Sequence, residues 1–296
     1  MSVVGELRIG PLSIVCTASD DYPPLRPVGA YASFFRPAPV DTTPASCTLH
    51  LRLTPGDTSP PDRNPDFASG KHWKLYRDDR NLLFATGYGD RRPPERMLTV
   101  RDDMTDAEIR IDPLALKSIP LPDRLAFPLS YPLDQILAWG MLAQMRAVLL
   151  HAALVIRPDG AGCLLAGPSG AGKSTLSAYC ADAGWTVLND DRALIYADGE
   201  RWLVSGTPWH GSGKYAEPRT VPLSGIYFLA QSETNRVEEI SSTEVLTELL
   251  RVTSLPVFLD GWCTPTLATL DTLTRAIPMR RLHFRRDPSA VDALSG

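Results

Sequence analysis

The sequence contains no long hydrophobic run and no basic, apolar leader of the kind that directs secretion. Its first twenty residues, MSVVGELRIGPLSIVCTASD, mix acidic, polar and apolar side chains. No segment approaches the ~18 consecutive apolar residues that a membrane span requires. We therefore expect a cytoplasmic protein without a membrane partner.

Cysteine is scarce and scattered. No two cysteines form a C-x-x-C pair, and none stands at a zinc-binding spacing from a histidine. The five positions are Cys16, Cys47, Cys163, Cys180 and Cys263. An odd, dispersed set suits a reducing compartment, so we expect neither disulfides nor structural zinc.

An excess of positive charge is also missing. The formal net charge is −4 at pH 7, whereas an electrostatic grip on nucleic acid normally needs a clustered basic face. Hydrophobic residues make up 44% of the chain and charged residues 22%, as in ordinary folded proteins. At 296 residues the chain is long enough for two domains of ~100–200 residues each, and we expect no nucleic-acid partner.

The first part of the chain alternates short strand-like runs with clusters of Pro, Gly, Asp and Asn. The segment 54–71 carries four prolines and few apolar residues, which favours a long exposed loop. We predict an antiparallel, β-rich N-terminal domain over residues 1–128, with a role in acceptor binding left open. Its expected strands are 6–10, 13–18, 47–53, 73–78, 81–87 and 96–102.

The composition changes near residue 129, where a second domain covering 129–296 is expected to begin. After Pro132, apolar residues recur at helical spacing and predict a helix that bridges the two halves. These residues are Leu133, Ile136, Leu137 and Met141. The apolar runs 148–156 and 161–167, joined by the turn sequence RPDG, then predict a β-hairpin.

The segment LLAGPSGAGKST, residues 164–175, satisfies the pattern G-x-x-x-x-G-K-[ST] in a strand–loop–helix context. In such a loop, backbone N–H groups and the helix N-terminus bind phosphate oxygens, Lys173 reaches the terminal phosphates and Ser174 ligates Mg²⁺. The sequence therefore predicts ATP and Mg²⁺ as cofactors. The expected binding residues are Gly167, Pro168, Ser169, Gly170, Ala171, Gly172, Lys173, Ser174 and Thr175.

A short amphipathic helix should follow the loop, because apolar residues recur from Leu176 to Ala183 and Gly184 suits a helix C′ position. The strand WTVLNDD comes next and ends in Asp190 and Asp191. We expect it to run beside the strand that feeds the loop, which would bring the acidic pair near the phosphates. One carboxylate can then accept a hydroxyl proton while the other helps to hold Mg²⁺. The alternative is that the pair forms the rim of a hairpin.

Residues 149–195 resemble the C-terminal catalytic domain of the HPr kinase/phosphorylase family, in which a His precedes the loop and a strand ends in Asp-Asp. The resemblance implies a P-loop kinase domain of the HPr kinase/PEP carboxykinase-like type, an α/β fold with a mixed sheet. It implies that the paired aspartates, Asp190 and Asp191, serve as catalytic acid/base and as part of the Mg²⁺ environment, and it places His151 near the phosphates. We allocate Asp190 to catalysis beside Lys173 and His151, and Asp191 with Ser174 to the metal. The reverse allocation of the two aspartates remains open. On its own, His151 would be a polar residue in an apolar strand.

The segment 205–220, SGTPWHGSGKYAEPRT, stands where the family carries a Glu-containing signature. It resembles the loop of HPr-kinase-like proteins found beside peptide-modification genes, including kinases of lasso-peptide precursors. Its members Trp209, His210, Lys214 and Arg219 are candidates to contact phosphate or acceptor from a mobile loop, and an exposed connection is the alternative. The departure leaves the reverse, phosphorylase activity open.

The remaining sequence predicts structural elements. Residues 222–231 and 279–284 read as strands, and 241–250 as a helix opened by Ser241 and Glu244 at capping-box spacing. Four arginines are expected to be solvated charges, namely Arg236, Arg280, Arg281 and Arg285.

These patterns together predict an ATP- and Mg²⁺-dependent kinase that phosphorylates a Ser or Thr hydroxyl of a peptide or small protein. A ribosomal peptide natural-product precursor is one such acceptor. A small-molecule kinase and a non-catalytic ATP-binding regulator are the alternatives. GTP is less favoured, because the sequence has no N-K-x-D segment. The acceptor and the oligomeric state stay open, a homo-oligomer included.

Overall fold

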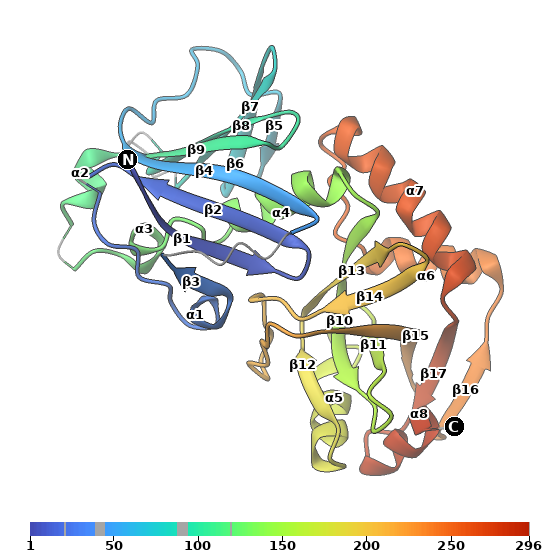
Figure 1. Cartoon of the computed structure of the whole chain (residues 1–296). Helices are drawn as coiled ribbons and strands as arrows, with labels where there is room; N and C mark the ends of the chain where they lie inside the picture. Colours follow the sequence, from blue (N-terminus) through green and yellow to red (C-terminus); the bar gives the residue numbers. More distant parts are fainter. Residues whose placement is uncertain (21, 39–44, 88–93, 119, 296) are drawn as a thin grey trace. The chain divides into compact units, whose positions relative to one another are not determined.

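The computed structural model describes residues 1–20, 22–38, 45–87, 94–118 and 120–295. It is a mixed α/β protein with two mixed β-sheets (Figure 1). The chain divides into two compact units, unit 1 at Met1–Gln144 and unit 2 at Met145–Gly296. The sequence analysis placed the domain boundary between residues 128 and 129. In the structure, the helix that follows residue 129 belongs to unit 1, and the two units meet in the sequence at Gln144 and Met145.

Unit 1 is built on one sheet. Within the described residues it has nine strands in the order β3-β1-β2-β4-β9-β8-β7-β6-β5. The six strands expected from the sequence are confirmed, and β3, β5 and β9 are additional. The bounds are β1 Ser2–Ile9, β2 Leu12–Ala18, β3 Phe35–Pro37, β4 Cys47–Pro55, β5 Phe67–Ser69, β6 Trp73–Asp78, β7 Asn81–Thr86, β8 Arg96–Arg101 and β9 Asp106–Ile111.

One expectation for unit 1 was wrong, and another is confirmed only in part. The sheet is not purely antiparallel, because β2 pairs with β4, and β4 with β9, in parallel. Parallel neighbours need long crossover connections, and the chain between these strands is long enough to provide them. The expected exposed loop is found over residues 56–66, which form no helix or strand, but the segment 54–71 as a whole is not all loop. It begins inside β4, ends with β5, and buries Thr58, whose Oγ1 donates to the Pro94 carbonyl at 2.5 Å.

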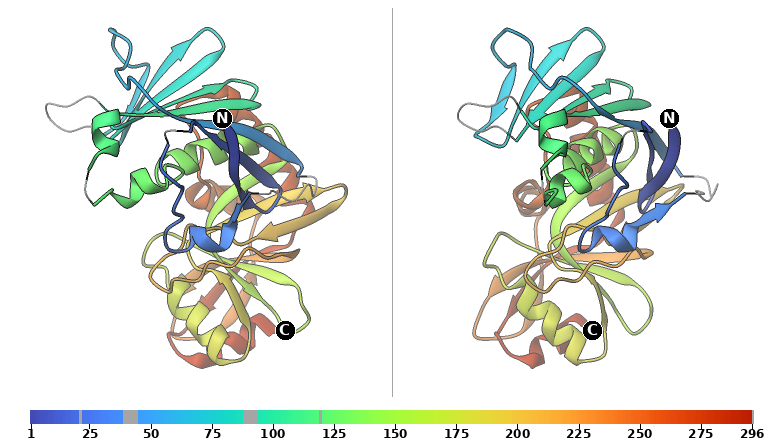
Figure 2. Two further views of the ribbon diagram at one scale, coloured as in Figure 1. Left: turned by 60° about the vertical axis from the view of Figure 1, so that its left-hand side comes forward. Right: turned by 90° about the vertical axis from the view of Figure 1, so that its left-hand side faces the viewer.

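The helix predicted after Pro132 is confirmed as α4, Leu133–Ala143, and all four of its predicted apolar residues are fully buried. Figure 2 shows α4 alongside the sheet of unit 1. Three short helices, α1 Tyr31–Phe34, α2 Pro113–Leu116 and α3 Asp123–Ala126, complete the unit. The buried Arg96 ties the segment before α4 to the sheet, because its guanidinium donates to the carbonyls of Pro128 and Tyr131 at 3.0 and 3.2 Å.

Unit 2 contains the glycine loop and a second mixed sheet. Strand pairings close a ring, from β10 through β13, β14, β15 and β11 back to β10. The predicted hairpin is confirmed as β10 and β11, and the predicted late strands as β15 and β17. The bounds are β10 Ala147–Ile156, β11 Gly162–Ala166, β12 Thr186–Asn189, β13 Arg192–Asp198, β14 Arg201–Ser205, β15 Thr220–Gln231, β16 Arg236–Glu239 and β17 Met279–Phe284.

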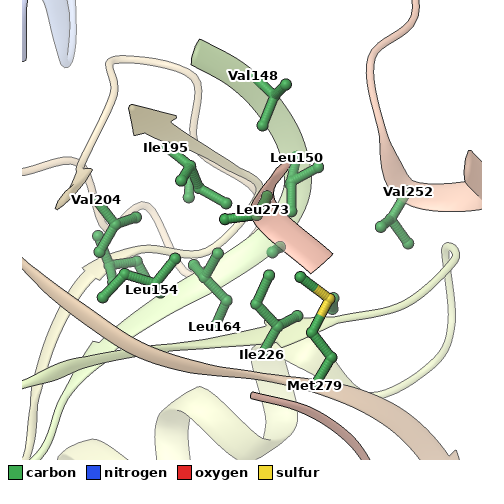
Figure 3. Close-up of a cluster of buried hydrophobic side chains, with 14 of the residues drawn as sticks. Val148, Leu150, Leu154, Leu164, Ile195, Val204, Ile226, Val252, Leu273 and Met279 are labelled. Atoms are coloured by element: carbon green, nitrogen blue, oxygen red, sulfur yellow. The ribbon is translucent and has the colours of Figure 1, made fainter. Parts of the chain in front are cut away.

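Helices cover the two faces of this sheet. The alternating side chains of β10 show the division. Leu150 and Leu154 join the apolar cluster with α6 and α7 (Figure 3). Ala153 and Val155 point to the other face and join the cluster with α5. The predicted helices α5 and α6 are confirmed, the latter with both halves of its capping box. The bounds are α5 Lys173–Asp182, α6 Ser242–Val252, α7 Asp260–Ala276, η1 Pro288–Val291 and α8 Asp292–Ser295.

No helix in the described part of the chain is both long and apolar enough to cross a membrane. The four arginines predicted to be solvated charges all form ion pairs with neighbouring carboxylates. Their partners are Glu238 for Arg236, Glu239 for Arg280, Glu238, Glu244 and Glu248 for Arg281, and Asp287 for Arg285.

Candidate functional site

The glycine loop connects the end of β11 to the start of α5. Gly172 caps α5 with φ 105°, a left-handed conformation, and a Cβ there would lie 2.6 Å from Cζ of the buried Phe284. Only glycine fits such a position without strain. Gly170 also has a positive φ of 83°. The loop therefore turns directly into the N-terminus of a helix, where unpaired backbone N–H groups favour an anion.

Lys173 folds back over this loop. Its Nζ donates to the carbonyls of Gly167 and Pro168 at 2.7 and 3.1 Å, and the residue is only 7% exposed. Burial lowers the pKa of the Lys173 ammonium, while the negative charge of Asp191 acts in the opposite direction. The lysine is thus held against the loop and is electrostatically coupled to the acidic pair.

The acidic pair lies at an interruption in a strand. Both β12 and β13 pair antiparallel with β10, and the pairings Asn189 with Leu154 and His151 with Arg192 keep one register across the gap. Asp190 and Asp191 occupy that gap, and the turn of the β13–β14 hairpin lies further along the chain. The expectation that β12 runs beside the loop-feeding strand was wrong, because β11 has β10 on one edge and β15 on the other.

Asn189, which the sequence analysis did not single out, shapes this interruption. The residue is fully buried, and its Oδ1 accepts the backbone N–H groups of Asp191 and Arg192 at 2.9 and 2.7 Å. Its Nδ2 donates to the carbonyls of Thr207 and Trp209 at 3.1 and 3.0 Å. Asn side chains often form turns by accepting a backbone N–H two residues further along the chain. The sequence N-D-D could therefore have been used to predict a turn at Asn189.

Asp191 sits between two cationic or hydrogen-bonding partners. Its Oδ1 lies 3.0 Å from Nε2 of His151, and its Oδ2 lies 3.5 Å from Nε of Arg192. Burial alone would raise the pKa of the Asp191 carboxyl, but the hydrogen bond from His151 and the charges of Arg192, His151 and Lys173 outweigh it and lower this pKa. The structure thus couples Lys173, Asp191 and His151, three of the residues predicted from the sequence. Arg192 was missed because a lone arginine after Asp-Asp has no distinctive spacing.

Asp190 has a different environment. It is 2% exposed, and its two carboxylate oxygens accept the backbone N–H groups of Gly211 and Gly213 at 2.7 and 2.6 Å. A Cβ on Gly213 would lie 2.8 Å from Asp190 Oδ2, so the close approach requires glycine there. Asp190 therefore anchors the segment that follows β14.

This segment, residues 206–219, is bonded to its surroundings along its length and does not behave as the free loop expected from the sequence. The Glu217 N–H donates to the Leu188 carbonyl at 2.9 Å, and Ser212 Oγ donates to Ser174 Oγ at 3.4 Å. Trp209 is buried at 6% exposure rather than available to a ligand. His210, Lys214 and Arg219 are exposed. The segment thus reaches the start of α5.

The remaining loop residues differ in exposure. Pro168, Ser169 and Gly170 are exposed, while Ala171, Ser174 and Thr175 are half-buried. Among the residues that the structure describes, no group of three or more His, Cys, Asp or Glu side chains is arranged to hold a metal ion. Mg²⁺ bound with a nucleotide usually takes only one or two carboxylates and otherwise phosphate and water ligands. A hydroxyl such as that of Ser174, together with one carboxylate, would be a donor set of that kind.

Two comparisons with known proteins gave matches. Among solved structures, the Hpr(Ser) kinase/phosphatase from Coxiella burnetii matches with 15% sequence identity over 50% of this chain and 93% of that chain, with a TM-score of 0.28. Residues 135–254 match the family model ScmC, described as SynChlorMet cassette protein ScmC. The stretch matched by that model includes the glycine loop, the acidic pair and the segment 206–219.

Proposed function

We propose that this protein is a kinase that transfers the terminal phosphate of ATP to a Ser or Thr hydroxyl of a peptide or small protein. The observation that carries the proposal is the coupling of Lys173 in a G-x-x-x-x-G-K-S loop to Asp191, which His151 and Arg192 hold in its charged form. The resemblance of residues 149–195 to the HPr kinase/phosphorylase family supports the same chemistry.

The glycine loop would bind the phosphates. Its backbone N–H groups and the N-terminus of α5 suit phosphate oxygens, and Lys173 would leave the carbonyls of Gly167 and Pro168 to pair with the terminal phosphates. The Ser174 hydroxyl would hold Mg²⁺ together with phosphate and water ligands, and the metal when bound neutralises charge on the phosphate oxygens. The sequence-based allocation, in which Asp191 is a metal ligand, is the alternative to a role of Asp191 as the base.

The geometry favours Asp191 over Asp190 as the group that accepts the acceptor's proton. Asp190 is almost fully buried and both of its oxygens accept backbone N–H groups, whereas the Asp191 side chain is 28% exposed and is electrostatically coupled to Lys173. As the hydroxyl oxygen bonds to the terminal phosphorus and ADP leaves, the hydroxyl proton passes to Asp191. The allocation drawn from the sequence, with Asp190 as base, stays a prediction that the same variants test.

A peptide or protein acceptor is favoured by the segment 206–219. It reaches Ser174 through Ser212, and it carries the exposed cationic side chains of Lys214 and Arg219. Lys214 is two residues from Ser212, and an exposed cation near a phosphate site suits an acceptor with acidic residues near the reacting hydroxyl.

The direct test is phosphoryl transfer from labelled ATP to a peptide pool in the presence of Mg²⁺, read by mass spectrometry. We expect Lys173→Ala to lower transfer about 10²–10³-fold, because it removes a preorganised charge from the transition state. Lys71→Ala, which removes an exposed lysine of unit 1, is the matched control and should transfer like the wild type.

Other outcomes separate the alternatives. Phosphorylation of small hydroxyl compounds but of no peptide would favour a small-molecule kinase. Binding of Mg²⁺·ATP without transfer to any acceptor would favour an ATP-binding regulator. Equal transfer by Lys173→Ala and the wild type would contradict the proposed site itself.

A further inference from the structure

Three neighbouring parallel strands of unit 2 end at one edge of the sheet. β11 pairs in parallel with β15, and β15 pairs in parallel with β17. The glycine loop follows β11, residues 231–233 end β15 and begin the next connection, and residues 285–287 follow β17. In sheets of this kind, ligands bind outside the carboxyl ends of the parallel strands.

An open cleft of about 640 Å³ lies at the ends of β15 and β17, lined by residues 231–233 and 284–287. Two contacts join it to the glycine loop. Gln231 Nε2 donates to the Gly170 carbonyl at 3.0 Å, and the Phe284 ring approaches Gly172 so closely that a Cβ there would lie 2.6 Å from Cζ. The cleft is therefore a direct extension of the loop that we propose to bind phosphate.

Hydrogen bonds to backbone groups hold the walls of the cleft together. The Ser232 N–H donates to the Phe284 carbonyl at 2.9 Å, and the Arg285 N–H donates to Asn235 Oδ1 at 2.7 Å. On the α5 side, the Tyr179 hydroxyl donates to the Arg286 carbonyl at 2.9 Å. These bonds fix the backbone from which the side chains of Glu233 and Arg286 project, and both residues are exposed.

We propose that this cleft binds the nucleoside part of ATP, with the triphosphate running back over the glycine loop toward Asp191. The inference rests on the proposed function, and it specifies the direction in which ATP lies across the glycine loop. The planar guanidinium of Arg286 suits stacking on a purine ring, and the carboxylate of Glu233 suits the ribose hydroxyls as an acceptor.

The strand order agrees with this direction. β10 pairs with β11 on the edge opposite to β15, and β12 pairs with β10. Across the sheet the order is thus β12, β10, β11, β15 and β17. The glycine loop after β11 lies between Asp191, which follows β12, and the cleft at the end of β17. A nucleotide laid across the loop would place its base at one side and its terminal phosphate at the other.

A larger cavity of about 890 Å³ lies elsewhere in unit 2 and does not compete for this role. It is lined by α6, α7 and residues 276–279, with apolar side chains such as Leu246, Leu250 and Leu267 prominent. None of the residues that line this cavity belongs to the glycine loop. Nucleoside binding there would leave the triphosphate without its backbone N–H donors.

Calorimetric titration of the full chain with ATP and with inorganic tripolyphosphate, each with Mg²⁺, tests the proposal. The double variant Glu233→Ala/Arg286→Ala should bind ATP about tenfold more weakly than the wild type, because it loses the stacking and ribose contacts. Its affinity for tripolyphosphate should stay within about twofold, since the phosphate-binding loop is untouched. The control Arg236→Ala/Glu239→Ala removes the same residue types from β16, and it should match the wild type with both ligands.

Any other result contradicts a nucleoside site in this cleft. The results also show whether the proposed kinase function fails with it. Wild-type ATP affinity in the cleft variant, or an equal loss for ATP and tripolyphosphate, would exclude a nucleoside site in this cleft while leaving the kinase proposal intact. Equal affinity of the wild type for both ligands would have the same meaning. A wild-type chain that binds neither ligand would contradict the proposed function as well.

Discussion

At the scale of single residues, the two adjacent aspartates owe their different roles to their partners. Asp191 is surrounded by His151, Arg192 and Lys173, which together favour its charged form. Asp190 is shielded from solvent and accepts two backbone N–H groups. Neighbouring side chains at a strand interruption point in different directions, so one faces the glycine loop and the other faces the segment 206–219.

The lowered pKa of Asp191 predicts a pH-dependent contribution to the stability of unit 2. A carboxyl group whose pKa is lower in the folded than in the unfolded state stabilises the fold above the unfolded value, and loses that effect as pH falls through the folded value. Starting from the ordinary value of 3.8, the contribution should be complete at neutral pH and fade below about pH 4.

Urea unfolding of the wild type and of Asp191→Asn between pH 7 and pH 3 measures this effect. We expect the wild type to be more stable at pH 7, with the difference shrinking as the pH falls below about 4. A difference that is the same at every pH would mean that the charge of Asp191 contributes nothing to folding. Asp159→Asn, at an exposed carboxylate in the β10–β11 turn, is a control.

At the scale of structural elements, the segment 206–219 depends on contacts with the strand interruption. Asn189 and Asp190 hold it through side-chain hydrogen bonds to Thr207, Trp209, Gly211 and Gly213. The segment in turn contacts Ser174 at the start of α5. Its position beside the glycine loop therefore follows from two buried polar side chains, because the segment forms no strand of its own.

Asp190→Ala should release this segment without unfolding unit 2. The substitution removes the acceptor of both bonds, which should speed amide exchange about tenfold or more. Hydrogen exchange followed by mass spectrometry should show faster exchange at Gly211 and Gly213 and unchanged exchange in α5. Asp191→Asn serves as the comparison, since its carboxylate accepts neither of these groups. Unchanged protection at residues 211–213 in Asp190→Ala would contradict the anchoring role.

Elements with local signals could be predicted from the sequence. The hairpin of β10 and β11, the loop-to-helix transition and the capping box of α6 all depend on residues a few positions apart. Helix α7 gave no such signal, because it contains Gly261, Pro265 and several threonines. It is stabilised by packing of Trp262 and Leu273, and the Thr266 and Thr269 hydroxyls donate to carbonyls four residues back.

At the scale of the whole molecule, the pairing of strands that are distant in the sequence could not be predicted. The sequence indicated which runs form strands but not that β12 pairs with β10, nor that β4 has parallel neighbours on both edges. The candidate site shows the same limit. Its loop was predictable from a motif, whereas the separation of Asp190 from Asp191 depends on a segment about twenty residues further along the chain.

The burial of the cysteines in both units predicts their reactivity. Cys16, Cys163 and Cys180 are 0% exposed, and burial raises the pKa of each thiol to about 12. Cys47 and Cys263 are only partly buried. Iodoacetamide at pH 8 should therefore label Cys263 and Cys47 in the native protein and all five cysteines in denaturant, as mass spectrometry of the digests would show. Rapid native labelling of Cys163 or Cys180 would contradict the packing of α5 on the sheet.

The most direct test of the account is the rate of phosphoryl transfer from ATP in Asp191→Asn, measured beside the wild type and Asp190→Asn across a Mg²⁺ titration. The substitution preserves side-chain size and removes the charge and the site that accepts a proton. We predict that Asp191→Asn lowers the transfer rate about 10²–10⁴-fold while ATP affinity changes by only a few fold. A transfer rate within tenfold of the wild type in Asp191→Asn, or a loss confined to Asp190→Asn, would contradict the assignment of Asp191 as the base.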